Sequence, residues 1–480
     1  IQALSCDIFR MLDCKGVVRI DYMFDKATEK VYITEINTIP CDFSVYNSTG
    51  LLNPQIPFMM RAGGSYQTPW TRDASINTWA AGRLLEPEVA RNTLLAVCVL
   101  NENGDPIIQP DDQRWDRVVW IVGAWQYYLA TGDRDFLTVA RGIAMRGLQQ
   151  LDKEWFHEET GLYRGGSFFN DGISGYPKDI YLPGKDHSFM GEHPATETIF
   201  SFSTNCIYCQ AWHILDRTNA ILGISDPAAA ERHDALKEKI LATFRNEDGS
   251  CNYLLYPDGR VDPSQELAGI SFGVLFDILP ADALKNLKRE EYGIPSIMPP
   301  FQGLFSKERP GRHNNLIWPF LNGFYIQAAA NAGLEAIAAR ELRNMTVLLN
   351  SADGIYEIYN PYDGSVDGGW QIGGDDLQGH LWDSCPDQTW SATSYIGAVL
   401  QGVFGIDIQE DGIAFRPCVP EYLKDSCLKS LTIRGKRFAL KLQGCGSRIV
   451  SVTVNGQHRD KAFLPYSEAT DLNDILLTLE

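Results

Sequence analysis

A change in the period of the apolar residues constrains the fold of this chain more than any other feature. From about residue 66 to residue 405, apolar residues recur at helical spacing, and the helical segments come in pairs joined by short Gly, Pro and Asp breaks. In the first pair, Ile76, Trp79 and Leu84 share one helical face, and the letters EPE at 86–88 end it. We expect further helices at 117–130 with 134–151, 199–222 with 227–245, 264–278 with 281–290, 314–332 with 335–350, and 388–404.

Such antiparallel hairpins bury their apolar faces best when they close into a double ring of helices. The sequence therefore predicts a mainly α protein, an (α/α)6 helical barrel of the six-hairpin type. A closed ring of six hairpins needs twelve helices, whereas the pattern gives about eleven, so we expect one helix to be missing at the front of the ring.

Both ends of the chain differ from this helical middle. Residues 1–45 are predicted as a helix followed by two alternating, β-rich strands. From about residue 406 the chain returns to short strands, in the segments GIAFRPCVP, CLKSLTIRG, KRFALKLQG and RIVSVTVNGQ. We therefore divide the chain into a short α+β fragment at 1–45, a barrel domain at 46–405 and a small β-rich domain at 406–480.

Charge and composition exclude several classes of protein. The formal net charge of −19 offers no attraction to a nucleic acid or an anionic membrane, and suits a neutral substrate. No apolar run reaches the roughly 18 residues of a membrane span. The 11 cysteines are odd in number and scattered, as in a reduced, cytoplasmic protein. Cys206 and Cys209 lack the further ligands of a zinc site, so we interpret them as core residues of a helix.

The segment YQTPWTRDASINTW at 66–79 places adjacent opposite charges between tryptophans at the start of a helix. Asp73 could cap that helix while Arg72 pairs with a surface carboxylate. Alternatively the tryptophans stack on a sugar ring, and Arg72 and Asp73 bind neighbouring hydroxyls as donor and acceptor. The loops at 158–177, 312–324, 352–364 and 385–396 are also rich in aromatic residues and carboxylates, which favours the second interpretation.

Four segments together resemble a clan of glycoside hydrolases that includes glucoamylases, debranching glucosidases and processing glucosidases. They are YQTPWTRDASINTW, RHNNLIWPFLNGF, GIYEIYNPYDG, and QTWSATSYIGAVLQGVFGI with the following DGIAFRPCVP; the resemblance covers about residues 50–455. In that clan an aromatic-flanked Arg-Asp pair grips the terminal sugar. The resemblance implies Trp70, Arg72, Asp73, Trp318 and Trp390 as substrate-binding residues. It also implies an inverting exo-glycosidase that acts on an α-glucoside or a related small glycoside without a cofactor or metal.

Inverting hydrolysis needs a carboxylic acid that protonates the leaving oxygen and a carboxylate that activates water on the opposite face. The two carboxyls are expected about 6.5–9.5 Å apart. The resemblance implies Glu357, which lies between Tyr356 and Tyr359, as the general base.

The general acid is harder to assign. In the clan it lies in the long loop after the fourth barrel helix, where Asp171 matches one of two known patterns. Two phenylalanines precede Asp171, and we expect these apolar neighbours to raise the pKa of its carboxyl. Tyr163 stands at the position of the other pattern and has no carboxyl, and Glu159 and Glu192 remain alternatives for the acid.

The segment GVVRIDYMFDKATEKVYITEINTIP at 16–40 resembles the carboxyl-terminal part of D-alanine–D-alanine ligases, an ATP-grasp family. The resemblance implies Asp21, Glu35 and Asn37 at the positions that bind magnesium in that family. The nucleotide-gripping lysines and the substrate-binding domain of the family have no counterpart in this sequence, so we do not expect ligase activity.

Two alternatives to an α-glucosidase remain open. A rhamnosidase or a sugar phosphorylase would share the architecture, and a phosphorylase would need a basic pocket for phosphate in place of Glu357. In the other alternative, the barrel binds carbohydrate without catalysis and is fused to a ligase remnant.

Overall fold

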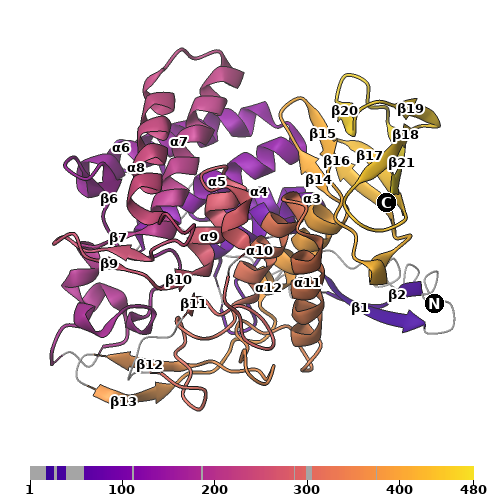
Figure 1. Cartoon of the computed structure of the whole chain (residues 1–480). Coiled ribbons are helices and arrows are strands. Elements are labelled where there is room, and N and C mark those ends of the chain that lie inside the picture. Colours follow the sequence, from indigo (N-terminus) through magenta and orange to yellow (C-terminus); the bar gives the residue numbers. More distant parts are fainter. Residues whose placement is uncertain are drawn as a thin grey trace.

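The computed structural model describes residues 18–25, 30–38, 59–66, 68–110, 113–184, 187–285, 287–298, 305–373 and 376–480. Its inner layer consists of α2 (Thr71–Asn77), α5 (Arg114–Thr131), α7 (Phe202–Leu222), α9 (Leu267–Leu275), α10 (Pro319–Asn331) and α12 (Thr389–Gly397) (Figure 1). Each of these helices packs against the next in this order, and α12 packs against α2. The ring is therefore closed, and the predicted helical barrel is confirmed.

Close packing in the ring depends on glycine at two seams. A Cβ atom on Gly123 of α5 would lie 2.9 Å from the carbonyl oxygen of Ser75, and one on Gly397 of α12 would lie 2.8 Å from that of Ala80. Ala80 belongs to the π turn η1 (Thr78–Gly82), which continues α2 into α3 (Arg83–Leu85); α12 likewise continues into the π turn η7 (Ala398–Val403). Only a residue without a side chain allows the backbones to approach this closely.

An outer layer of amphipathic helices covers the ring: α4 (Pro87–Ala96), α6 (Arg134–Trp155), α8 (Ala228–Phe244) and α11 (Glu335–Leu349). The carboxylate of Asp133 caps α6 by accepting a hydrogen bond of 2.9 Å from the N–H of Phe136. The helix predicted at 281–290 is wrong, because only a 3-10 turn, η6 (Ala281–Leu284), follows α9. The residues after it, KNLKREEYG, contain too few apolar side chains to bury a helical face.

The C-terminal strands form two sheets, drawn in yellow on one side of the helices in Figure 1. One contains β14 (Ile406–Ile408), β15 (Gly412–Phe415) and β20 (Phe463–Pro465). The other has the order β16 (Cys427–Ile433), β17 (Lys436–Gln443), β21 (Leu472–Leu479), β18 (Ile449–Val454), β19 (Gln457–Arg459). The four strands predicted after residue 406 are confirmed. The central strand β21 was not predicted; it pairs parallel to β17 and antiparallel to β18 and buries every second residue.

Short strands and 3-10 turns form the connections between the helices. The strand pairs are β3 (Cys98–Leu100) with β4 (Pro106–Ile108), β5 (Phe156–His157) with β6 (Leu162–Tyr163), β7 (Phe200–Ser201) with β8 (Leu254–Leu255), β8 with β9 (Val261–Asp262), β10 (Gln265–Glu266) with β11 (Ile297–Met298), and β12 (Trp370–Gly373) with β13 (Asp376–Leu381). The 3-10 turns are η2 (Ile173–Gly175), η3 (Lys178–Ile180), η4 (Met190–Glu192), η5 (Pro194–Glu197) and η8 (Glu421–Leu423). Strands β12 and β13 lie at the bottom of the view in Figure 1.

The N-terminal fragment contains the two predicted strands, β1 (Val18–Asp25) and β2 (Lys30–Thr38). They pair antiparallel, with Asp21 opposite Glu35 and Arg19 opposite Asn37. The backbone register thus places all three positions implied by the ligase resemblance on the paired strands β1 and β2. The helix predicted before β1 and the domain boundary at residue 45 lie outside the described residues.

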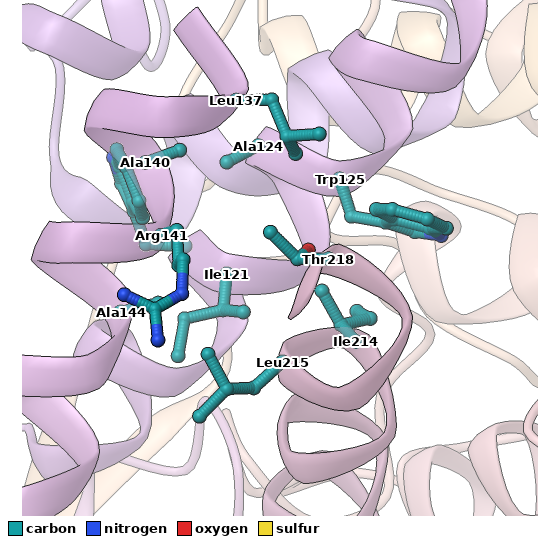
Figure 2. Close-up of a pocket in the computed structure, with 11 residues that line it drawn as sticks. Ile121, Ala124, Trp125, Leu137, Ala140, Arg141, Ala144, Ile214, Leu215 and Thr218 are labelled. Carbon is teal, nitrogen blue, oxygen red and sulfur yellow. The ribbon is translucent and has the colours of Figure 1, made fainter. Parts of the chain in front are cut away.

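A narrow apolar recess with a volume of about 10 Å³, partly open to solvent, lies between α5, α6 and α7. Figure 2 shows Ile121 and Trp125 of α5, Leu137 of α6 and Leu215 of α7 around it, with Arg141 beside them. None of the residues predicted to bind or cleave substrate is among its lining residues, all of which are described. The recess is therefore a gap in the packing of the two helical layers.

Two smaller predictions can be compared with the structure. Cys206 and Cys209 are buried on α7, which confirms their interpretation as core residues of a helix. Within the described ranges, every helix is too short or too polar to cross a membrane.

Candidate active site

The Arg-Asp pair lies in the first turn of α2. Trp70 is the N-cap residue and is about half exposed; its side chain makes no capping hydrogen bond, and Asp73 lies in the first turn rather than at the N-cap position. Arg72 does not extend to a surface carboxylate. Its Nη2 donates to Oδ2 of Asp171 over 3.2 Å, and its Nη1 donates to the carbonyl oxygen of Phe169 over 3.1 Å. Arg72 therefore joins α2 to the loop that carries Asp171.

His313 binds the second oxygen of the Asp171 carboxylate, with 3.0 Å between Nε2 and Oδ1. The other ring nitrogen, Nδ1, faces Nε2 of the Gln371 amide at 3.4 Å. The Gln371 amide oxygen accepts a hydrogen bond of 2.8 Å from the hydroxyl of Ser174, which fixes the amide so that its nitrogen faces His313. Nδ1 is therefore an acceptor, and Nε2 carries the hydrogen that His313 donates to Asp171.

Glu357 lies in the loop between α11 and β12 and pairs with Arg312. Nη2 of Arg312 donates to Oε2 of Glu357 over 2.6 Å, and both side chains are at least nine-tenths buried. The hydroxyl of Tyr66 lies 3.4 Å from Oε1. Arg312 is itself held by the carbonyl oxygen of Gly368, which accepts from Nη1 over 2.8 Å. The Glu357 carboxylate is thus fixed at one oxygen and less closely bound at the other.

Two tryptophan rings form an aromatic wall against the arginines that bind the two carboxylates. Trp318 and Trp390 are buried and pack edge to face with 5.9 Å between ring centroids. The Arg72 guanidinium lies 5.7 Å from the Trp390 centroid, and the Arg312 guanidinium lies 5.3 Å from the Trp318 centroid. The structure therefore brings four of the five predicted substrate-binding residues together with both predicted catalytic carboxyls. The fifth, Trp70, stands exposed at the edge of this group.

Asp73 is a third carboxyl within electrostatic range of the other two. Burial raises the pKa of Asp73 to about 7; Arg72 opposes this rise, whereas the negative charges of Glu357 and Asp171 add to it. Asp73 therefore exchanges its proton near neutral pH, and its charge depends on both other carboxyls.

The pKa of Asp171 is shifted opposite to the sequence prediction. Burial beside Phe168 and Phe169 does favour a higher pKa, but the charge of Arg72 and the hydrogen bond and charge of His313 outweigh it, and the pKa of Asp171 falls well below its usual range. Burial in turn lowers the pKa of His313, with Arg312 and Arg72 adding to that effect and Asp171 opposing it. In the free protein Asp171 is ionised and His313 is a neutral donor near pH 7.

Sequence reasoning missed several residues of this site, namely Tyr66, Arg312, His313 and Gln371. Three of them lie in segments that carried the family resemblance: YQTPW begins with Tyr66, and RHNN begins with Arg312 and His313. Gln371 is in β12, where no motif marked it. Trp382 was also missed; its ring is exposed, and the Arg312 guanidinium lies 5.7 Å from its centroid.

The two alternatives for the general acid lie in connections between the helices. Glu159 is exposed in the turn between β5 and β6, and Glu192 is in the 3-10 turn η4. Asp171, by contrast, shares Arg72 with the Arg-Asp pair. In the described part of the chain, no three His, Cys, Asp or Glu side chains are grouped so that they could hold a metal ion.

A closed ring of helix pairs, with arginine-bound carboxyls beside a tryptophan wall, defines a class of protein: the helical-barrel glycoside hydrolases. Residues 117–391, more than half of the chain, match the family model of the mannosylglycerate hydrolase MGH1-like glycoside hydrolase domain. The chain belongs to this family and is a glycoside hydrolase.

Solved structures show the same fold. The chain is similar to an uncharacterized conserved protein from Thermus thermophilus, with a TM-score of 0.54 and 16% identity over 71% of this chain and 95% of that one. It is also similar to the GH63 mannosylglycerate hydrolase of the same organism in complex with Tris, with a TM-score of 0.54 and 13% identity over 72% of this chain and 96% of that one. At these identities the similarity concerns the fold.

The N-terminal fragment has different relatives. Residues 1–49 match the family model of the D-ala D-ala ligase C-terminus. Over 40 residues the chain is 55% identical to the D-alanine–D-alanine ligase of Clostridium novyi (strain NT), which covers 8% of this chain and 12% of that ligase. The chain thus spans about one eighth of the length of this curated relative, and the ligase fragment suggested by the sequence is confirmed.

Proposed function

We propose that this glycoside hydrolase is an inverting exo-glycosidase that cleaves an α-glucoside or a related small oligosaccharide, with Asp171 as general acid and Glu357 as general base. One observation carries the proposal. The two carboxylates belong to one site, each bound by an arginine, and the two arginines lie against neighbouring rings of the Trp318–Trp390 wall.

The surroundings of Asp171 support its role as the acid. Its side chain is 30% exposed, against 5% for Glu357, so it is the carboxyl that a leaving group can reach. His313 occupies Oδ1, so Oδ2, which accepts from Arg72 in the free protein, is the oxygen that carries the proton once Arg72 turns to the sugar. In the free protein Arg72 keeps the carboxyl ionised, but a bound sugar draws Arg72 onto its hydroxyls and excludes water. Both changes raise the pKa of Asp171 toward protonation.

The surroundings of Glu357 support its role as the base. Arg312 fixes Oε2, which leaves Oε1 to accept the proton of an attacking water. Tyr66 lies on the same side as Oε1, and burial beside Glu357 raises the pKa of its phenol far above the usual range, so it stays a hydrogen-bond donor. The phenol can therefore orient the water without taking its proton.

Sugar recognition is assigned to the remaining residues of the site. Arg72 and Asp73 bind neighbouring hydroxyls as donor and acceptor, Trp318 and Trp390 form the buried wall against the ring, and exposed Trp70 stacks on the substrate at the edge. One Arg-Asp pair beside one tryptophan wall provides contacts for a single terminal sugar, which favours exo action.

A panel of 4-nitrophenyl glycosides, assayed with and without phosphate, tests the proposal. It includes α-glucoside, α-rhamnoside and α-mannoside, together with mannosylglycerate because the family and one structural relative carry that name. Hydrolysis of the α-glucoside with initial release of β-glucose, followed by proton NMR, is the expected result. Initial release of α-glucose would contradict inversion, release only with phosphate would indicate a phosphorylase, and no release from any sugar would indicate a binding domain.

We further propose the domain division 1–45, 46–405 and 406–480, with all groups for sugar chemistry in the barrel. Every candidate site residue lies between positions 66 and 390. Removal of residues 1–45 is therefore expected to leave glycosidase activity within about twofold, as is usual for changes away from a site. Loss of folding on truncation would instead assign these residues to the barrel.

A further inference from the structure

A buried carboxyl with no part in the proposed chemistry lies beneath the loop that carries Asp171. Glu266 is the N-cap residue of α9 and is almost fully buried. Its Oε1 accepts hydrogen bonds from the hydroxyls of Ser167 and Ser203, and its Oε2 accepts one of 3.1 Å from the N–H of Ser203. Ser167 belongs to the Asp171 loop, and Ser203 lies in the first turn of the inner helix α7.

The direction of these hydrogen bonds is set by Glu266. The Ser203 hydroxyl accepts from the N–H of Phe168 over 3.1 Å, and the Ser167 hydroxyl accepts from the amide nitrogen of Asn170 over 3.1 Å. Each hydroxyl has one hydrogen, and each gives it to Glu266. The Glu266 carboxylate can only accept hydrogen bonds. Because both serine hydroxyls donate to it, their oxygens are left to accept from the Phe168 N–H and the Asn170 amide of the loop.

The loop needs such support because it contains a strained residue. Phe169 has φ of 59°, in the left-handed region that a bulky residue rarely adopts. A conformation of this kind persists only where surrounding contacts hold it. Phe169 lies between the two residues that bind the serines, and its carbonyl oxygen is the one that accepts from Arg72.

We propose that Glu266 is a positioning residue, which holds Asp171 in place by fixing both serine hydroxyls as acceptors for the 168–170 loop segment. The inference rests on the proposed role of Asp171. It adds a carboxyl that touches neither substrate nor Asp171 and that acts through the loop alone.

The charge state of Glu266 decides the assay conditions. Burial raises the pKa of Glu266 to about 7, while the hydrogen bonds from the two serines oppose the rise. The titratable groups around it are the phenols of Tyr176 and Tyr253 and the thiol of Cys206, whose pKa values burial raises well above their usual ranges. At pH 8 Glu266 is ionised and these neighbours are neutral, so variants are compared at that pH.

The variant Glu266→Gln keeps the shape of the side chain and one acceptor oxygen. Its amide nitrogen then faces the N–H of Ser203, donor against donor. In the full chain, kcat on an unactivated alkyl α-glucoside is expected to fall about 10- to 100-fold, the usual result of displacing a catalytic group by up to about 1 Å. KM should change less than kcat, because Arg72 is carried by α2 and the tryptophans lie outside the loop, although Arg72 loses part of its contact with Phe169.

A double-mutant cycle separates positioning from general damage. If Glu266 acts through Asp171, then adding Glu266→Gln to Asp171→Asn costs little beyond Asp171→Asn alone. The matched control is Glu341→Gln, which removes another fully buried carboxyl, paired with Arg289 and Arg340 at the outer helix α11. That control is expected to lower the melting temperature and to leave kcat unchanged. Equal losses from Glu266→Gln in both backgrounds would overturn the inference.

Hydrogen exchange tests the loop independently of the chemistry. Glu266→Gln should speed exchange of the Phe168 amide selectively, whereas Glu341→Gln should not. Unchanged exchange at Phe168 would overturn the positioning role even if activity fell. If Asp171→Asn is fully active while Phe168 exchange still rises in Glu266→Gln, the role of Glu266 in ordering the loop holds and the proposed acid is the part that fails.

Discussion

The Asp171 and Glu357 carboxylates are each bound by an arginine, but their surroundings differ. Asp171 keeps an exposed face and is shared between Arg72 and a neutral histidine, whereas Glu357 is buried and is bound closely by Arg312. Arg72 also belongs to the proposed sugar-binding pair, while Arg312 is held by backbone carbonyls. The pairing with arginine therefore does not distinguish an acid from a base. We expect the acid and the base to differ in whether a bound substrate can draw the arginine away from the carboxylate.

The largest effect is expected for Glu357→Gln, which keeps the size of the side chain and removes the proposed base. kcat should fall by about 10²–10⁴-fold on every substrate, the usual contribution of general base catalysis. Binding of glucose, measured by calorimetry, should change little. If this variant turns over normally, Glu357 is not the base, and the two carboxylates do not form an acid and base pair.

Asp171→Asn is expected to cause an equally large loss only where the leaving group needs a proton. On unactivated alkyl or natural α-glucosides kcat should fall by about 10²–10⁴-fold, but on α-glucosyl fluoride the loss should be below about tenfold, because fluoride leaves without protonation. The ratio of the two rates measures the acid role directly. Equal losses on both substrates would assign Asp171 to another role, such as holding Arg72.

A smaller loss is expected from Asp73→Ala, which removes the acceptor of the sugar-binding pair. The buried partners that remain lack an acceptor, which costs roughly 1–3 kcal/mol, or about 5- to 150-fold in glucose affinity. Calorimetric titration of glucose measures the change, and Glu357→Gln is the matched comparison because it should bind sugar normally. Normal sugar binding by Asp73→Ala would remove the Arg-Asp pair from recognition.

Asp73→Asn is expected to act on stability, and its effect should depend on pH. The folded protein holds the pKa of Asp73 at about 7, above its value in the unfolded chain. The unfolded chain therefore ionises Asp73 first, so wild-type stability declines as pH rises from about 4 to 7 and the decline then ends. Asn does not titrate, so the gain in melting temperature over wild type should be larger at pH 8 than at pH 4.5. The exposed Asp460→Asn is the control, and a gain independent of pH would contradict the shift.

The helical barrel could be predicted from the sequence because apolar residues recur with clear helical spacing in the inner helices. The barrel and four C-terminal strands were predicted correctly. The 281–290 helix failed because Pro280 and the polar residues after it favour a single turn, and β21 was missed because its pairing with β17 joins segments far apart in the chain.

The candidate site followed from the sequence only in part. Motifs marked the Arg-Asp pair, Asp171 and Glu357, but the partners of each carboxyl depend on how loops meet. His313, for example, is set by Gln371 on a strand that no motif marked. The pKa of Asp171 was predicted in the wrong direction for the same reason, because adjacent phenylalanines are visible in the sequence and a distant arginine is not.

The ring of inner helices cannot close until the ribosome has made the last of them. Asn77 bonds to Thr393, and Arg83 bonds to Gln401, across separations of 316 and 318 residues. At roughly 5–20 residues per second, a ribosome needs on the order of 15–60 s to make the intervening segment. Throughout that time the first inner helix has no partner for the face that α12 will cover. Newly made chains are therefore most exposed to aggregation before their last barrel helix emerges, and messages that slow translation upstream of residue 389 lengthen that period.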